Sequence, residues 1–300
     1  MAIYPYYSTT TINKDVLTAS TFKAVSLVAA ANAGYDLNTT YDCPGEYQVG
    51  TRAFQNFESK AQGRLSMKKA MAISCDTIWY KIAFAEWLKD GGLRPKANPN
   101  DYFFKAAEGF QIGKKTGIDL PSESSGRLAN REWRKSWYEE NKDFYCNYKE
   151  RATKEQQTAF LIELARENCL DGDKIRAGDA VNFSIGQGDT VISPLKLVQM
   201  YAAIGNGGTI WKPTVGKAIV TTDGKVIQTI DPVKLGTLPA SKILQSKRAS
   251  AANGCSRNFL SEGRKRHRDC PLLKALPSLC SGTKLPKTRR ILQIKTLSSC

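Results

Sequence analysis

Ser20-Thr-Phe-Lys-Ala-Val-Ser-Leu-Val-Ala-Ala-Ala-Asn-Ala-Gly34 is an apolar segment near the start of this 300-residue chain. Its apolar residues recur at helical spacing and Gly34 is suited to end a helix, so we predict one helix capped by Ser20 or Thr21. Ser20 and Lys23 are three residues apart and share a face of that helix. The positive end of the helix favours an alkoxide-like hydroxyl, and a buried lysine loses its proton more easily. This pair therefore predicts a serine nucleophile that is activated without histidine.

The Ser-x-x-Lys pattern occurs four times, beginning at Ser20, Ser66, Ser193 and Ser281. At least three matches must therefore be accidental. Context favours Ser20, because its apolar helix directs Lys23 toward a core. A second signal is Ser74-Cys75-Asp76, a polar triplet inside an otherwise apolar helical region. Taken alone, the triplet is more typical of a simple helix break. Beside Ser20 and Lys23, its hydroxyl and carboxylate could relay protons and hold the lysine in place.

Spacing, capping residues and turn residues predict the other elements. Asp223-Gly224 between two apolar runs predicts a β-hairpin with a type I′ turn. Residues 1–18 are expected to be irregular, and residues 36–64 are rich in turns. The remaining predicted helices cover 66–87 with a break near 74–76, 102–109, the polar region 129–172 with 153–169 as its clearest part, and a helix from Ser193-Pro194 to Asn206-Gly-Gly208.

Charge divides the chain into two parts. Lys and Arg number 44, and Asp and Glu number 28, which gives a net charge of +16. Residues 242–300 hold 14 of the basic residues and only two acidic ones, so the part before them is nearly neutral. This tail has no hydrophobic periodicity and contains the basic run Arg264-Lys-Arg-His-Arg268. Two interpretations remain open, namely a disordered basic tail and a segment translated out of frame.

The histidine and cysteine content excludes several kinds of site. His267 is the only histidine, so a Ser-His-Asp triad or a His-rich metal site could only be built around it. The eight cysteines form no CxxC pair, so a zinc site is not expected. We predict no cofactor. An even number of cysteines permits disulfides, but the sequence does not pair them. Neither a secretory signal nor an apolar run long enough to span a membrane is visible.

Five motifs in a fixed order give the chain a family resemblance. They are Ser20-Thr-Phe-Lys23, Ser74-Cys-Asp76, Thr116-Gly-Ile-Asp-Leu-Pro121 with Glu123, Ile185-Gly-Gln-Gly188, and Ser193-Pro-Leu-Lys-Leu197 with Ala202-Ala-Ile-Gly-Asn-Gly-Gly208. Over about residues 18–241 this order resembles the transpeptidase domain of class B penicillin-binding proteins, the elongation-type peptidoglycan D,D-transpeptidases. The implied fold is the α/β fold shared with serine β-lactamases, with the helical part present and much of the central antiparallel sheet missing.

The resemblance implies an acyl-transfer enzyme. By motif position, Ser20 is the nucleophile that attacks the penultimate D-Ala carbonyl of a stem peptide, and Lys23 is its base. Ser74 relays the proton to the leaving amine. Asp76 stands where the family usually has Asn, and it would orient Lys23 or the substrate amide. An oxyanion hole would need the backbone N–H of Ser20 and one from a β-strand.

The resemblance also implies partners and a location. The expected partners are stem peptides that end in D-Ala-D-Ala, β-lactams and membrane proteins of the elongation complex, with no specific nucleic acid. The family is anchored to the cell membrane with its catalytic domain outside the cytoplasm. This chain shows neither the anchor nor the pedestal domain that the family has upstream.

The sequence departs from the family pattern at the site strand. The family's Lys-Thr/Ser-Gly motif should follow residue 241, where the basic tail stands instead. Lys115-Thr116-Gly117 belongs to the loop motif, and Ser281-Gly-Thr-Lys284 has the wrong order. Thr18-Ala19 also replaces the usual Pro-Gly before the nucleophile. Inactivity of this chain is therefore one of the expected outcomes.

These departures define the expected domains. They are an irregular N-terminal remnant over 1–18, a partial transpeptidase domain over 19–241, and a basic, Cys-containing tail over 242–300. We interpret the chain as truncated after about residue 241, with a frameshift as the leading explanation of the tail.

Two alternative functions remain open. A serine β-lactamase or β-lactam sensor shares the fold and the first two motifs, but a lactamase needs a positioned water and base for deacylation. The stretches 185–188 and 202–208 fit the transpeptidases better. A nucleic-acid binder could act through the excess positive charge of residues 242–300. That tail has a single aromatic residue, Phe259, on which a base could stack.

Overall fold

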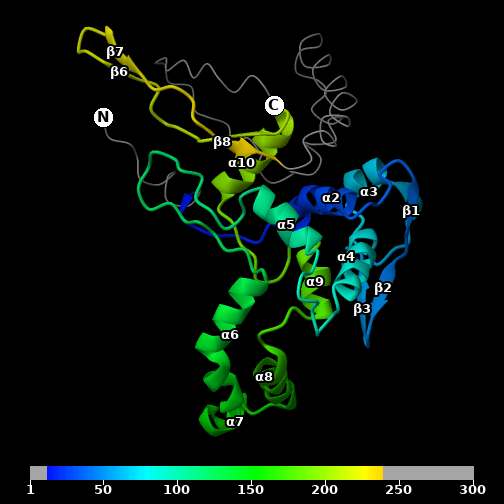
Figure 1. Ribbon diagram of the computed structural model, residues 1–300. Coiled ribbons are helices and arrows are strands. Elements are labelled where there is room, and N and C mark those ends of the chain that lie inside the picture. Colours follow the sequence, from blue (N-terminus) through cyan, green and yellow to red (C-terminus); the bar gives the residue numbers. More distant parts are fainter. Residues whose placement is uncertain (1–11, 239–300) are drawn as a thin grey trace, which may run out of the picture.

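The structure, a computed structural model, describes residues 12–238 (Figure 1). The predictions for residues 1–11, the basic tail over 242–300 and the Ser281 motif lie outside the described residues. Within them the helical elements are η1 (Ala19–Phe22), α2 (Lys23–Asn32), α3 (Met67–Ile73), α4 (Thr77–Lys89), α5 (Tyr102–Gly109), α6 (Arg131–Cys146), α7 (Tyr148–Arg151), η2 (Lys154–Gln156), α8 (Ala159–Asp171), α9 (Ala177–Phe183) and α10 (Pro194–Gly205).

The strands of the described residues pair only two at a time. They form four antiparallel pairs. Two are hairpins of consecutive strands, β2 with β3 and β6 with β7. The other two, β1 with β4 and β5 with β8, join the strands that flank each hairpin in the sequence. This limited strand pairing agrees with the expected α/β fold that retains its helices and little of its sheet. The strands are β1 (Thr40–Cys43), β2 (Glu46–Val49), β3 (Arg52–Gln55), β4 (Gly63–Ser66), β5 (Thr209–Trp211), β6 (Ala218–Val220), β7 (Val226–Thr229) and β8 (Lys234–Thr237).

Side-chain caps fix the starts of several helices. The Ser193 hydroxyl accepts a hydrogen bond from the Lys196 N–H at 3.2 Å, and Pro194 follows at the first helical position, as the sequence predicts. The Asn130 side chain accepts from the Trp133 N–H at 2.9 Å and caps α6 in the same way. The predicted helix over 102–109 matches α5, and the predicted break near 74–76 separates α3 from α4.

Two sequence predictions about local geometry are wrong. The helix predicted from Ser20 begins instead with the 3₁₀ turn η1, and neither Ser20 nor Thr21 caps it. The β6–β7 hairpin exists, but its turn is not type I′, because that turn needs positive φ at both central residues. In the Thr221–Gly224 turn only Gly224 has a positive φ, of 87°, while the Gly224 N–H donates to the Thr221 carbonyl.

The core lies beneath η1 and α2. Phe22 and Val25 on these elements are fully buried, and the Phe183 ring at the end of α9 lies 4.8 Å from the Phe22 ring. On its other side Phe183 lies 4.7 Å from the ring of Phe104 in α5. Burying apolar side chains of this size stabilises the fold by about 1.5–3 kcal/mol each. The chain therefore anchors the turn that carries Ser20 through α2, α5 and α9.

Two projections extend from this core in opposite directions (Figure 1). The helices α6, α7 and α8 form one end, where α6 and α8 pack together and the disulfide Cys146–Cys169 joins them. The β6–β7 hairpin forms the other end. None of the helices in the described part of the chain is long and apolar enough to cross a membrane.

Candidate active site

The turn that presents Ser20 is held by a distant loop. Ala19 has a positive φ of 45°, a conformation that costs an ordinary residue free energy, so the surroundings must stabilise it. Its N–H donates to the Gly186 carbonyl at 2.9 Å, and the Thr18 hydroxyl donates to the same oxygen at 3.2 Å. From α10, the Tyr201 hydroxyl donates to the Thr21 carbonyl at 2.9 Å. The motifs around residues 186 and 201 therefore make direct hydrogen bonds to the turn that presents Ser20 and stabilise its conformation.

Ser74 is presented by the C-terminus of α3. It is the C-cap residue with φ 60° and ψ 39°, the left-handed conformation. The Cys75 N–H behind it donates to the Ala70 carbonyl at 3.0 Å, which closes the helix end. Cys75 is also joined to Cys43 of β1 by a disulfide. The helix break predicted from Ser74-Cys75-Asp76 is thus a turn that is fixed on both sides.

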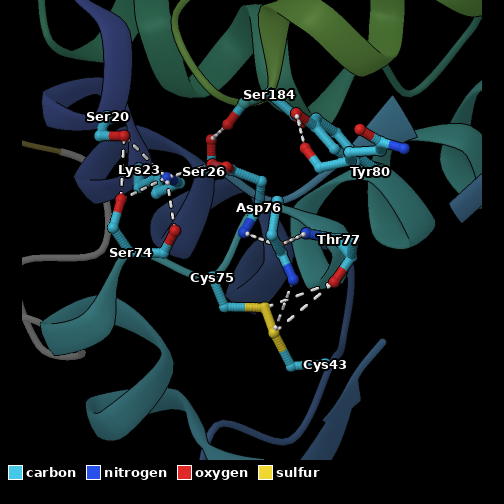
Figure 2. A network of polar contacts seen from close by, with 12 residues as sticks. Ser20, Lys23, Ser26, Cys43, Ser74, Cys75, Asp76, Thr77, Tyr80 and Ser184 are labelled. Carbon is cyan, nitrogen blue, oxygen red and sulfur yellow. Dashed lines mark hydrogen bonds and ion pairs between the residues drawn. A yellow bond between two sulfur atoms is a disulfide. The ribbon is translucent and has the colours of Figure 1, made fainter. Parts of the chain in front are cut away.

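Ser20, Lys23 and Ser74 form a closed triangle of hydrogen bonds (Figure 2). The Lys23 Nζ lies 2.9 Å from the Ser20 Oγ and 2.7 Å from the Ser74 Oγ. The Ser74 hydroxyl donates to the Ser20 Oγ at 2.9 Å, and the Lys23 Nζ also donates to the Ser74 carbonyl at 3.2 Å. Three predicted residues, 54 positions apart at their extremes, therefore meet within hydrogen-bonding distance.

Asp76 completes the group by forming an ion pair with Lys23. Only 1% of the Lys23 side chain is exposed, and this burial lowers the pKa of the amine below its ordinary value of 10.5. The Asp76 carboxylate opposes that shift, because its charge and hydrogen bond favour the ammonium form. Burial is the larger effect, so Lys23 releases its proton more readily than a lysine in water.

The group opens into a cleft of about 650 Å³. Ser20, Ser74 and Asp76 line it, and so does Gln187 from the loop after α9. Residues of the loop between β3 and β4 also line the cleft, and the Phe57 side chain there is 97% exposed. Residues 55–62 follow no motif, so the sequence does not indicate that this loop lines a cleft. A cleft of this size falls in the range that binds small-molecule ligands.

The other described Ser-x-x-Lys matches lack such a group. Ser66 and Lys69 are exposed, and the Ser66 hydroxyl only caps α3. Ser193 caps α10, and the buried Lys196 donates to the Gln199 side chain at 2.8 Å. Burial lowers the pKa of Lys196 to about 8. A buried lysine alone therefore does not set the candidate site apart. Among the described matches, the Ser20–Lys23 pair differs in having a second hydroxyl, from Ser74, beside the lysine.

The loop after α5 is closed by its own acidic residues. Glu123 accepts hydrogen bonds from the Thr116 N–H and hydroxyl, both at 2.5 Å, and from the Gly117 N–H at 3.0 Å. Asp119 accepts from the Val215 N–H at 2.8 Å and from the Gly216 N–H at 3.0 Å. Thr116 is fully buried in this loop and belongs to no strand, so Lys115-Thr116-Gly117 is not a site strand, as expected.

The sequence left the cysteines unpaired, whereas the structure pairs four of them. Cys43 joins Cys75 at a Cα–Cα distance of 6.4 Å, and Cys146 joins Cys169 at 4.8 Å. The partners are 32 and 23 residues apart, and no spacing motif indicates which cysteines pair. Among the described residues, no three His, Cys, Asp or Glu side chains gather in a way that could hold a metal ion.

A protein-family comparison agrees with the fold and the motifs. Residues 3–247 match the model of the penicillin-binding protein transpeptidase domain. The chain therefore belongs to the penicillin-binding transpeptidase family.

Its relatives include several proteins named peptidoglycan D,D-transpeptidase MrdA. The Acinetobacter baumannii protein is 27% identical over 202 residues, which are 66% of this chain and 23% of that protein. The Escherichia coli K12 protein is 25% identical over 222 residues, 71% of this chain and 27% of that protein. The chain thus spans about a quarter of the length of these curated relatives.

Solved structures share the fold. Penicillin-binding protein PBP2 from Helicobacter pylori aligns with a TM-score of 0.57 and 19% identity, over 86% of this chain and 39% of that chain. PBP2 from Pseudomonas aeruginosa, solved in complex with WCK 5153, aligns with a TM-score of 0.55 and 21% identity, over 82% and 46%. At this identity the likeness concerns the fold alone.

Proposed function

We propose that this chain carries the acyl-transfer site of a penicillin-binding D,D-transpeptidase, which cross-links peptidoglycan stem peptides through a Ser20 acyl-enzyme. The observation that carries the proposal is the triangle of Ser20, Lys23 and Ser74, with each polar contact at 2.9 Å or less, at the edge of an open cleft. Two hydroxyls and one buried amine can move a proton without histidine.

In the first step the Ser20 Oγ attacks the carbonyl carbon of the penultimate D-Ala, and its proton passes to the neutral Lys23 Nζ. The Asp76 carboxylate stabilises the ammonium that forms. The backbone N–H of Ser20 is one donor for the oxyanion, and a second donor would have to come from another segment.

In the second step the tetrahedral intermediate collapses. The bond between the carbonyl carbon and the nitrogen of the terminal D-Ala breaks. The amine takes the proton from Lys23 through the Ser74 hydroxyl, which lies 2.7 Å from the Lys23 Nζ. The amine of a second stem peptide then attacks the ester, gives its proton back along the same route and releases Ser20. The terminal D-Ala leaves and one cross-link forms, so the chemistry is balanced without a cofactor.

The relatives support the substrate class and the kind of partner. The MrdA proteins are named peptidoglycan D,D-transpeptidases, and the Helicobacter pylori PBP2 has been solved in complex with MreC. We extend to this chain the family's D-Ala-D-Ala substrate, its binding of β-lactams and its association with elongation-complex membrane proteins, at the outer face of the cell membrane. The division into a partial transpeptidase domain over 19–241 and a separate tail is part of the same proposal.

A fluorescent penicillin tests the proposal directly. Incubation of the full chain should give one covalently bound label per molecule, at Ser20 in the peptide map, because a β-lactam acylates the same hydroxyl. The variant Ser20→Ala should lose the label, whereas Ser193→Ala, which alters another Ser-x-x-Lys match, should keep it. A folded wild-type chain that takes no label would contradict the proposal and agree with the inactivity expected from the missing Lys-Thr/Ser-Gly strand. Rapid release of the label would instead indicate a β-lactamase.

A further inference from the structure

Asn56 caps a helix to which it does not belong. It is buried directly after β3, and its side-chain oxygen accepts the N–H groups of Asp76 at 2.9 Å and Thr77 at 3.2 Å. These are the N–H groups of the N-cap residue and of the first residue of α4, and Asp76 makes no side-chain cap of its own. A residue 20 positions earlier therefore supplies the cap that stabilises the start of α4.

The other end of the same amide binds two further segments. The Asn56 Nδ2 donates to the Pro44 carbonyl at 2.7 Å and to the Lys60 carbonyl at 3.1 Å. The oxygen thus faces two N–H groups and the nitrogen faces two carbonyls, so only one orientation of the amide satisfies all four contacts. Asn56 therefore connects three segments by hydrogen bonds: the turn between β1 and β2, the 56–62 loop that lines the cleft, and the start of α4.

These contacts affect the position of the Asp76 carboxylate, which forms the ion pair with Lys23. Asp76 has a short side chain, so a shift of its backbone moves its carboxylate relative to the Lys23 Nζ with which it pairs. A second hydrogen bond joins the start of α4 to the β1–β2 turn, because the Thr77 hydroxyl donates to the Pro44 carbonyl at 2.9 Å. Asn56 itself lines the cleft but makes no contact with Ser20 or Lys23 among the hydrogen bonds of the described residues.

We propose that Asn56 is a positioning residue of this site, which holds the Asp76 carboxylate against Lys23 and the 56–62 loop against the cleft. Its effect on the rate rests on the function proposed above. Its effect on the start of α4 does not, so the two can be tested separately.

The first measurement is hydrogen–deuterium exchange of the full chain, which needs no activity. In Asn56→Ala the amides of Asp76 and Thr77 lose their acceptor, so exchange in a peptide over 74–80 should become about five-fold faster or more. Asn56→Asp keeps the acceptor but places a carboxylate oxygen against the Pro44 and Lys60 carbonyls, so it should retain only part of the protection. The matched control is Asn130→Ala, which removes the cap of α6 and should leave the 74–80 peptide unchanged.

The second measurement is the rate of acylation by fluorescent penicillin. Asn56→Ala should lower the rate constant of the acylation step on the order of 10- to 100-fold, as expected when a catalytic group is misplaced. Asn130→Ala should leave that constant unchanged. In an Asp76→Asn background, Asn56→Ala should lose most of its effect, because Asn56 acts through that carboxylate.

The outcomes separate the two proposals. Unchanged exchange over 74–80 in Asn56→Ala would overturn the positioning role, whatever the activity of the chain. An equal loss of rate in the presence and absence of the Asp76 carboxylate would overturn the route through Asp76. If the wild-type chain takes no label while exchange changes as expected, the proposed function fails and the cap of α4 by Asn56 stands.

Discussion

The carbonyl oxygen of Gly186 accepts the N–H of Ala19 at 2.9 Å, one residue before the serine of the site. Gly186 has a φ of 75°, and a Cβ at this position would collide with the Thr18 hydroxyl, the Ala19 carbonyl and the Phe22 Cβ. Only glycine allows the loop after α9 to come this close to the turn that carries Ser20.

Gly186→Ala should therefore displace the serine turn. We expect a destabilisation of about 2 kcal/mol or more, together with loss of labelling by fluorescent penicillin. Gly188→Ala is the matched control, because Gly188 also has a positive φ but a Cβ there would have no atom within 4 Å. Urea unfolding and labelling of both variants check the expectation. Equal labelling by the two variants would contradict it.

The two described disulfides should differ in their effect on the site. Cys43–Cys75 holds the residue between Ser74 and Asp76, whereas Cys146–Cys169 joins α6 to α8 in the distant projection. Replacing either pair by serines should cost stability, typically about 2–4 kcal/mol. Only the loss of Cys43–Cys75 should slow acylation in the chain that remains folded. Thermal unfolding and labelling rates of the two double variants distinguish the effects.

The acylation rate should depend on pH through Lys23. The amine must be neutral to accept the Ser20 proton, so the rate should rise with pH as Lys23 titrates, below the ordinary lysine pKa of 10.5. Asp76 raises the Lys23 pKa, so Asp76→Asn should move this rise to lower pH. The pH profile of the labelling rate measures both. A rise that stays in place or moves to higher pH in Asp76→Asn would exclude this coupling.

Lys196 should make the fold more stable at alkaline pH. Burial lowers its pKa from 10.5 to about 8, so the unfolded chain binds a proton that the folded chain does not between these values. Stability from this group therefore rises as pH increases from about 8 to 10.5, by about 3 kcal/mol in all. Lys196→Met should remove that rise, whereas Lys69→Met at an exposed position should keep it. Urea unfolding at several pH values provides the comparison.

The residues of the candidate site could be proposed from the sequence because their signals are local or belong to a family order. The Ser20–Lys23 pair needs only helical spacing, and the Ser74 break follows from residues that disfavour helix interiors. No local sequence pattern predicts that the segment with Ser20 and Lys23 lies close to the segment with Ser74. This proximity depends on how α2 packs against α4 through the core, which spacing alone cannot give.

The hairpins and the long-range hydrogen bonds of Asn56 were harder to predict. The composition of residues 36–64 predicts only turns, although these residues contain β1, β2, β3 and part of β4. The β2–β3 turn places Gly50, with a φ of 59°, directly after Val49, and a glycine at the first turn position between short alternating runs is a usable hairpin signal. Asn56 offered no signal, because its role depends on the start of a helix 20 residues later.

The bridge between Cys43 and Cys75 makes the geometry beside Ser74 depend on the thiol–disulfide balance of the surroundings. Such bridges persist where oxidants prevail and are scarce in compartments rich in reduced glutathione. Material produced in a reducing host should therefore contain molecules with an untethered α3–α4 junction, and acylation measured on it should increase after mild oxidation. Preparations for any enzymatic assay of this chain should be checked for free thiols first.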